Sequence, residues 1–381
     1  MPAALVVIFL RGGADGLALV PPYADPILAE LRPTIASALP DDTRVAAPDR
    51  VVDIDGRFGL HPALAPLSPL IGAGELAIVH ATGSDDDTRS HFEAQDRMER
   101  AGITASSSAS GFLARHLASR PGPAAGPLAA LSFGAILPES VRGHSATALG
   151  SLRELGADAI DERALESLAS LYDGAAGEPL SLETELRAAG RDAVLVSREL
   201  GLLGKSDRDT RFPDTTLGNQ LADAVALLER RTELGVEVIT LDHGGWDTHF
   251  LQGASLAANA ADLAKSLAAF REALGDGFRD TTVVVLTEFG RRCRENVSLG
   301  TDHGRGSVAL VASGGLSRGG VFGPAPSLAA DALEGPGDLR VLTDYRLILA
   351  DVIEHSLKNP RVADVLPGLA TSSRLGLFTP R

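Results

Sequence analysis

Cysteine is nearly absent from this 381-residue chain, and no hydrophobic run is long enough to cross a membrane. The lone Cys293 excludes an intramolecular disulfide framework and a zinc site built from cysteines. Residues 2–10 are apolar but short, and they lack the charged start and the cleavage site of a signal peptide. We therefore expect a soluble cytoplasmic protein without a membrane partner, or a periplasmic one if an export signal has been removed.

Positive charge is also scarce. Lys and Arg number 35 against 50 Asp and Glu, which gives a net charge of −15. No basic run of the kind that binds a phosphate backbone occurs, so we exclude nucleic acid as a partner. Arg supplies nearly all of the positive charge, and its planar guanidinium suits contacts to carboxylate, phosphate or sulfate.

Several common nucleotide-binding and hydrolase motifs are missing. The glycine-rich segment 11–16 lacks the Lys-Ser/Thr pair of a Walker loop, and its glycine spacing does not match a dinucleotide fingerprint. No Gly-x-Ser-x-Gly sequence occurs, which argues against a serine esterase of the α/β-hydrolase kind. Segment 11–16 instead resembles an anion-binding nest with an arginine at the end of a strand.

Five short apolar runs, rich in branched residues, predict buried strands of a parallel sheet. The runs are 3–10, 75–80, 236–241, 281–286 and 307–313. Leu, Ala and Val at three- and four-residue steps predict helices over 91–100, 217–234 and 254–274. This alternation predicts an α/β protein whose central, mostly parallel sheet is sandwiched by helices.

No domain boundary is evident, so we expect a single α/β domain over residues 1–381. Residues 104–127 hold clusters of Ser, Ala, Gly and Pro, and they are expected to form a surface connection. Residues 150–210 are rich in Glu, Arg, Leu and Ala without a strand signal. They predict a helical insertion, which is a candidate cap that sets specificity.

Polar residues gather where the predicted strands end, the edge at which open α/β sheets bind ligands. The densest group is 242–249, with two carboxylates, two imidazoles and two glycines. In an extended loop Asp247 and His249 point the same way, because residues i and i+2 share a face. The group is a candidate site for zinc, manganese, magnesium or calcium. Turn-capping aspartates and ordinary hydrogen-bonded loop histidines are the alternative.

Further candidate ligands follow the next strands. Glu288 comes directly after a buried strand, where an unpaired charge is costly, so it must be hydrogen-bonded, ion-paired or metal-bound. Asp302 and His303 stand beside a glycine between two strands. The alternatives are ion pairs between Glu288 and the arginines just downstream, and a turn centred on Asp302.

Ser90 and His91 stand where a polar loop meets a predicted helix. Ser90 suits a helix N-cap, and Glu93 three residues later fits a capping box. The same position places the Ser90 hydroxyl at a helix N-terminus, where a transferred anionic group is stabilised. Ser90 is therefore a candidate nucleophile, and His91 is a candidate acid, base or metal ligand.

Five motifs, in order along the chain, resemble the bacterial DUF1501 family. They are 10–17, 89–96, 244–249, 287–291 and 301–304. That family is similar in layout to the alkaline phosphatase and sulfatase superfamily, so the resemblance implies a metal site at the strand ends of a sheet between helices. It also implies a metal-binding Asp after the first strand and a nucleophile at the start of the next helix. Arg11 occupies the expected position of that Asp, and Asp15 follows four residues later.

These observations predict a metal-dependent hydrolase of an anionic ester, of the phosphate or sulfate class. The expected metal ligands are Asp15, Asp247, His249, Glu288, Asp302 and His303. A metal would lower the pKa of a water or of the Ser90 hydroxyl, while Arg11 and Arg291 clamp a small anionic substrate. Transfer to another acceptor is an alternative. So is a non-catalytic binding or assembly protein of the same fold, in which Arg11 pairs with a carboxylate. The oligomeric state is left open.

Overall fold

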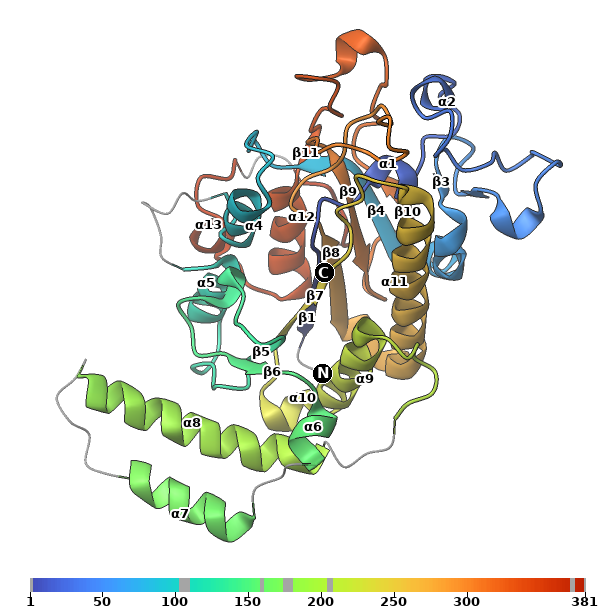
Figure 1. The fold of residues 1–381 in the computed structure, drawn as a ribbon. Coiled ribbons are helices and arrows are strands. Elements are labelled where there is room, and N and C mark those ends of the chain that lie inside the picture. Colours follow the sequence, from blue (N-terminus) through green and yellow to red (C-terminus); the bar gives the residue numbers. More distant parts are fainter. Residues whose placement is uncertain are drawn as a thin grey trace.

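A mixed sheet lies at the centre of the structure, a computed structural model that describes residues 3–102, 110–157, 161–173, 181–203, 208–370 and 374–379. Its strands are β1 (Ala4–Leu10), β4 (Leu76–Gly83), β5 (Ala130–Phe133), β6 (Thr147–Leu149), β7 (Val238–His243), β8 (Thr281–Leu286), β9 (Ser307–Ala312), β10 (Gly320–Phe322) and β11 (Thr343–Asp344). The order is β10-β4-β9-β8-β1-β7-β5-β6, and β11 pairs with β4 (Figure 1). A separate ladder joins β2 (Val52–Asp53) to β3 (Gly59–Leu60).

The strands run mostly parallel. β1 is parallel to both of its neighbours, β7 and β8, whereas β9 is antiparallel to β8 and to β4. β1 is buried along its whole length, which explains why its sequence is a continuous apolar run rather than an alternating one. The predicted α/β class with a central, mostly parallel sheet is confirmed.

Helices cover both faces of this sheet. They are α1 (Gly16–Leu19), α2 (Ile27–Leu31), α3 (Ser68–Gly72), α4 (His91–Glu99), α5 (Phe112–Ser119), α6 (Leu152–Ala157), α7 (Glu162–Tyr172), α8 (Leu182–Leu203), α9 (Thr216–Glu229), α10 (Arg231–Leu234), α11 (Gln252–Leu274), α12 (Tyr345–Asp351) and α13 (Val362–Val365). Val6 and Ile8 of β1 pack with α9 and α11, whereas Leu5 and Val7 pack with α5, α12 and α13. Alternate residues of β1 therefore contribute to two separate helical layers.

The expected surface connection over 104–127 is wrong in its central part. Residues 112–119 form α5, which buries Phe112, Leu113 and Leu117 in the core on one face of the sheet. The neighbouring Ser, Gly and Pro clusters dominate the composition of this segment and obscured a short amphipathic helix. Residues 104–109 lie outside the described part of the chain.

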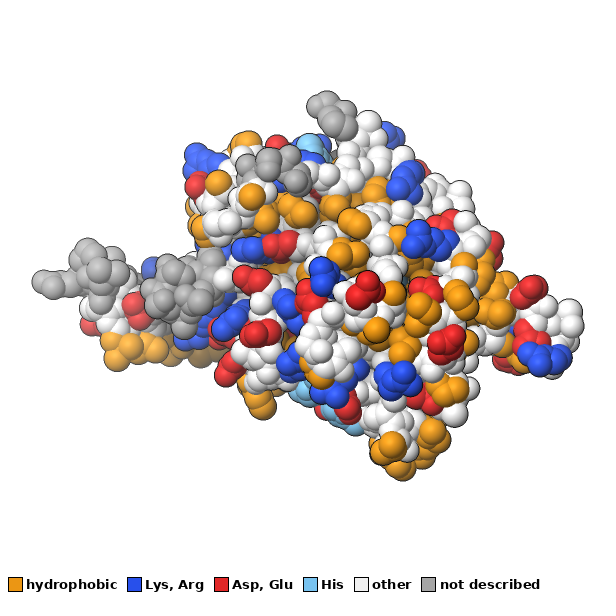
Figure 2. All heavy atoms as spheres, turned by 90° about the horizontal axis from the view of Figure 1, so that it is seen from above, with side chains coloured by type: hydrophobic (Ala, Val, Ile, Leu, Met, Phe, Trp, Pro, Cys, Tyr) orange, Lys and Arg blue, Asp and Glu red, His pale blue; other side chains and the backbone are white. Residues whose placement is uncertain are grey.

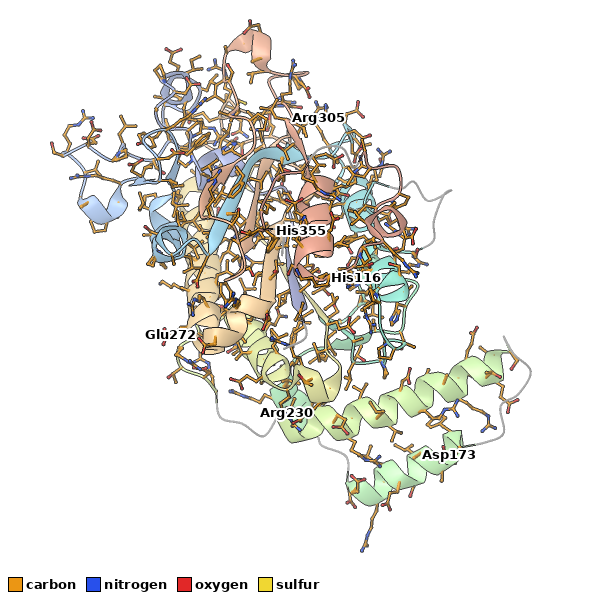
Figure 3. All side chains as sticks on the ribbon, turned by 180° about the vertical axis from the view of Figure 1, so that it is seen from behind. His116, Asp173, Arg230, Glu272, Arg305 and His355 are labelled. Carbon is orange, nitrogen blue, oxygen red and sulfur yellow. The ribbon has the colours of Figure 1, made fainter. Side chains whose placement is uncertain are left out.

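Residues 150–210 contain α6, α7 and α8 within their described part. Figure 1 places the α7–α8 hairpin at the end of the molecule opposite α1, and Figure 3 shows Asp173, just after α7, on this projecting unit. Leu195 of α8 shares a cavity with Leu128 and Leu234, which precede β5 and β7. The hairpin therefore lies near the amino ends of the strands, whereas a cap over the predicted site would lie at their carboxyl ends.

His80 of β4 is fully buried, and its hydrogen bonds fix a neutral ring. Its Nδ1 accepts from the Ala81 amide at 2.8 Å, and its Nε2 donates to the Val20 carbonyl at 2.9 Å. Burial lowers the pKa of His80 to about 4. Burial also lowers the pKa of His116, on α5 (Figure 3), to about 4. Both rings therefore disfavour protonation in the folded state.

We expect the free energy of unfolding to decrease as the pH falls from about 6.5 to about 4. The unfolded chain protonates these histidines near pH 6.5, while the folded chain resists until about pH 4. For His80 alone this difference corresponds to about 3 kcal/mol, lost across that window. Urea unfolding of wild type and His80→Gln at pH 7 and pH 4.5 measures it. An equally large decrease in the variant, which retains His116, would contradict the assignment to His80.

Candidate metal centre

Four side chains from three separate segments converge at the carboxyl edge of the sheet. His91 begins α4, Asp247 and His249 lie in the loop after β7, and His303 lies between β8 and β9. The Nε2 atom of His303 is 3.0 Å from that of His91, 2.9 Å from that of His249 and 3.1 Å from Asp247 Oδ1. Asp247 Oδ1 is also 3.0 Å from His249 Nε2, and Asp247 Oδ2 is 3.6 Å from His91 Nε2. Figure 2, the view from above, shows histidine side chains only at the margins of this surface, next to charged side chains.

The second ring nitrogen of each histidine, Nδ1, faces an oxygen atom outside the cluster. His91 Nδ1 is 2.8 Å from Glu288 Oε1, and His303 Nδ1 is 3.0 Å from the Arg89 carbonyl oxygen. His249 Nδ1 is 3.6 Å from an oxygen of Asp302. Because these oxygens only accept hydrogen bonds, the two shorter contacts place the N–H on Nδ1 and leave the Nε2 lone pairs facing the centre.

The ionisation of the cluster fits this tautomer. Burial raises the pKa of Asp247, but the hydrogen bond that Arg291 donates and the positive charge of Arg291 outweigh it and bring that pKa down to about 2. Burial lowers the pKa of His303. The hydrogen bond to Glu288 raises the pKa of His91, although burial opposes it. At neutral pH the cluster thus contains an ionised carboxylate, that of Asp247.

The donor set suits a divalent metal ion. Unprotonated Nε2 atoms cannot donate hydrogen bonds to one another, so their close approach leaves their lone pairs without a donor. A tetrahedral ion with metal–nitrogen distances of about 2.0–2.1 Å separates its nitrogen ligands by about 3.3 Å, close to the spacing observed. His91, Asp247 and His303 could hold such an ion. The Nε2 atom of His249 lies 2.9 Å from that of His303 and 3.0 Å from Asp247 Oδ1, so it is a further candidate donor.

Two buried groups hold the ligating rings in place. Glu288 Oε1 accepts from the Gly12 amide at 2.9 Å and from Gln95 at 2.8 Å, besides contacting His91. Burial raises the pKa of Glu288, but its hydrogen-bond donors, His91 first among them, lower it to about 2. The Phe289 ring packs 4.8 Å from the His91 ring and 4.9 Å from the His303 ring. Glu288 therefore orients a ligand from behind instead of lying among the converging donors.

The family of the chain is shown by sequence. The family described as "Protein of unknown function (DUF1501)" matches residues 2–357. The chain belongs to the DUF1501 family. The resemblance carried by the five motifs is thereby confirmed, while its wider relation to the alkaline phosphatase and sulfatase superfamily stays a prediction. No curated protein sequence matches the chain.

The likeness of this DUF1501 protein to one solved structure is weak. Nine solved chains match. One of them, described as "Structure of PH0037 protein from Pyrococcus horikoshii", has a TM-score of 0.28 and 11% sequence identity, over 82% of this chain and 85% of that chain. A likeness of this size carries no argument about fold or function. Among the described residues of the DUF1501 protein, no helix has the length and apolar character needed to span a membrane.

Asp15, an expected ligand in this DUF1501 protein, is held elsewhere. Both of its carboxylate oxygens accept from Arg32, at 2.9 and 2.8 Å, and Gln252 donates to it at 2.7 Å. Asp15 also caps α1 through the Ala18 amide at 3.1 Å. The Asp15 side chain is only 1% exposed, and its carboxylate oxygens already accept these hydrogen bonds. The structure therefore does not bring Asp15 into the cluster.

The two arginines expected to clamp a substrate contact protein acceptors. The Arg291 side chain is fully buried and donates to Asp247 Oδ1 at 2.6 Å and to the carbonyls of Gly13 and Thr301 at 2.6 and 2.8 Å. Arg11 forms ion pairs with Glu99 at 2.7 Å and with Asp242 at 2.8 Å. Arg291 thus orients a candidate metal ligand, and Arg11 is neutralised beside the site.

Ser90 occupies the expected N-cap position of α4, but the expected capping hydrogen bond is not observed. Ser90 precedes α4 in an extended conformation, and its side chain makes no capping hydrogen bond to the helix. Its hydroxyl therefore stays available next to His91. Asp302, another expected ligand, lies behind His249 and accepts from Asn296 at 3.1 Å.

Sequence reasoning missed two partners of the DUF1501 cluster. Gln95 was detectable, because it stands four residues after His91 on the same helix face and so reaches the same carboxylate. The Arg89 carbonyl was not detectable, because its direction depends on a left-handed backbone with φ of 53°. The Arg89 side chain is held by buried Asp338, with Nε–Oδ2 at 3.0 Å, which stabilises this conformation.

Proposed function

We propose that this protein is a metal-dependent hydrolase of anionic esters, of the phosphate or sulfate class. The observation that carries the proposal is the convergence of the Nε2 atoms of His91, His249 and His303 on the Asp247 carboxylate. Three imidazoles with one carboxylate favour zinc or another transition metal over magnesium or calcium, which prefer oxygen ligands. When bound, such an ion would supply Lewis-acid activation of water and neutralisation of negative charge.

The residues of the chain have distinct roles in this proposal. His91, Asp247, His249 and His303 hold the metal, and Glu288 keeps the proton of His91 on Nδ1. The first turn of α4 presents backbone N–H groups that no Ser90 side chain caps, and this positive helix end favours an anionic group. Ser90 is placed to accept the transferred group or to position water. Anion binding is thus assigned to the metal and to α4, and not to the buried Arg291.

A metal-exchange experiment tests the proposed activity. Protein purified without added metal is dialysed against a chelator and then reloaded with zinc, manganese or magnesium, with metal content measured by plasma mass spectrometry. We expect hydrolysis of aryl phosphate or aryl sulfate esters by zinc- or manganese-loaded protein, and its loss after chelation. His249→Ala should lose the same activity, whereas His144→Ala, remote from the cluster, should retain it. Stoichiometric metal without hydrolysis of either ester class would contradict the activity.

A non-catalytic binding protein is the second candidate, and the position of Arg11 favours it. Its ion pair with Asp242 is the pairing this hypothesis expects of an arginine that replaces a metal-binding aspartate. The hypothesis also expects that no metal binds, because a fixed cation repels a divalent ion. Persistent absence of metal after dialysis against each ion would therefore support it over the hydrolase.

A further inference from the structure

Exposed apolar residues are close neighbours, along the chain, of histidines in the candidate metal centre. Ten of the twelve phenylalanines are at most 6% exposed, whereas Phe92 is 88% exposed and Phe250 is 67% exposed. Phe92 directly follows His91, and Phe250 directly follows His249. Both exposed phenylalanines thus sit next to histidines of the metal cluster. Isolated exposed apolar residues are common on proteins, but aromatic rings confined to the edge of one site indicate a binding role.

Three leucine and valine side chains extend this surface. Leu251, Val297 and Leu299 are also exposed. Leu251 lies in the same loop as His249, whereas Val297 and Leu299 lie in the segment between β8 and β9. The Leu251 amide donates to the Ser298 carbonyl at 2.9 Å, which joins the loops. We call the five residues Phe92, Phe250, Leu251, Val297 and Leu299 the apolar rim.

The backbone holds part of the apolar rim in a costly conformation. Leu251 has φ of 45° and Leu299 has φ of 59°, in the left-handed region that bulky residues avoid. The Gln252 amide donates to the Leu299 carbonyl at 2.9 Å, so the second loop is fixed against the start of α11. Strain of this kind persists at functional sites, where the surrounding structure maintains it.

We propose that the substrate of this centre is amphiphilic: an anionic ester whose alkyl or aryl group lies against the apolar rim while its anionic group reaches the metal. The inference rests on the proposed function and names its substrate class. Phe92 and Phe250 are the side chains assigned to contact the apolar group, because both are highly exposed and each directly follows a histidine of the cluster. They act as specificity residues and take no part in bond breaking.

A soluble amphiphile fits the rim better than an anionic bilayer does. Binding to an anionic membrane surface needs a cluster of unpaired basic residues. Around this centre Arg11, Arg89 and Arg291 are each paired with a carboxylate, and the chain carries a net charge of −15. The rim therefore offers apolar contact without the charge needed to recruit such a surface.

Alkylphosphonates test the inference without requiring turnover. Their affinity for the zinc-loaded protein is measured by titration calorimetry, from methylphosphonate to octylphosphonate, below micelle-forming concentrations. We expect the affinity of wild type to increase up to about fourfold for each methylene that the rim buries. The double variant Phe92→Ser/Phe250→Ser should bind methylphosphonate as wild type does but lose most of the dependence on chain length. Leu186→Ser, which removes an exposed leucine on α8, is the matched control and should retain it.

The outcomes separate this inference from the proposed function. Equal affinity for all chain lengths, with zinc and methylphosphonate both bound, overturns the amphiphilic substrate and leaves the metal site intact. Zinc binding without phosphonate binding overturns the anionic ester, and the inference with it. A wild-type dimer that the double variant converts to monomer, by sedimentation velocity, identifies the rim as an interface between copies and also overturns the inference.

Discussion

His303→Ala is expected to abolish stoichiometric metal binding. The Nε2 atom of His303 lies within about 3.1 Å of His91, His249 and Asp247, so it is the centre of the donor cluster. Loss of a hydrogen-bond partner of a ligand alone costs about 10–100-fold in metal affinity. Loss of this ligand should therefore exceed about 100-fold. Competition titration with a chromophoric zinc chelator and plasma mass spectrometry measure the change.

Two variants make this result specific. His144→Ala removes a histidine that contacts the Ser145 carbonyl, and it should bind zinc as wild type does. Glu288→Gln keeps all the converging donors but weakens the acceptor behind His91, so its zinc affinity should fall between those of wild type and His303→Ala. Zinc stoichiometry and affinity in His303→Ala equal to those of wild type would refute the assignment of the centre.

Arg291→Met should destabilise the fold by about 3 kcal/mol, because it leaves buried carbonyl acceptors without a donor and an unsatisfied buried polar group costs about 1–3 kcal/mol. The guanidinium has no exposed surface and donates to Asp247 and to carbonyls in the loops after β1, β7 and β8. Methionine fills a similar volume but offers no donor, so these carbonyls and the Asp247 carboxylate lose their partner. Chemical unfolding, monitored by circular dichroism, measures the difference.

The measurement is made in the presence of chelator, so that a change in metal affinity does not contribute. Arg292→Met is the matched control, because that side chain is about one-third exposed and pairs with partly exposed Asp302 at 3.3 Å. We expect the control to lose at most about 1 kcal/mol. Equal stability losses in the two variants would show that Arg291 does not join the three loops.

The edge of the sheet that carries the site was predictable from sequence. Continuous apolar runs identified β1, β7 and β8, and parallel strands place the loops that follow them at one edge. The shared face of Asp247 and His249 followed from their spacing. These inferences succeed because they depend on local periodicity and on a general property of parallel sheets.

The contacts of single charged residues were not predictable. Asp15 has the sequence setting of a ligand, but Arg32 reaches it from α2's end and pairs with it in the core. Arg291 carries a guanidinium that could bind an anionic substrate, but its side chain points into the protein and forms an ion pair with Asp247. Local sequence does not determine which of several nearby arginines turns inward, because that choice depends on packing between distant segments.

The antiparallel direction of β9 has a consequence for how the family can diverge. Since β8 ends and β9 begins at the same edge of the sheet, the segment that joins them leaves and returns beside the metal cluster. Glu288 at its start and His303 near its end are anchored, while Val297 and Leu299 occupy the exposed turn between them. Insertions and deletions at this turn can accumulate without displacing a strand, because loops tolerate changes in length. The residues that bind the metal and the residues that select the substrate can therefore change independently, although both belong to the segment between β8 and β9.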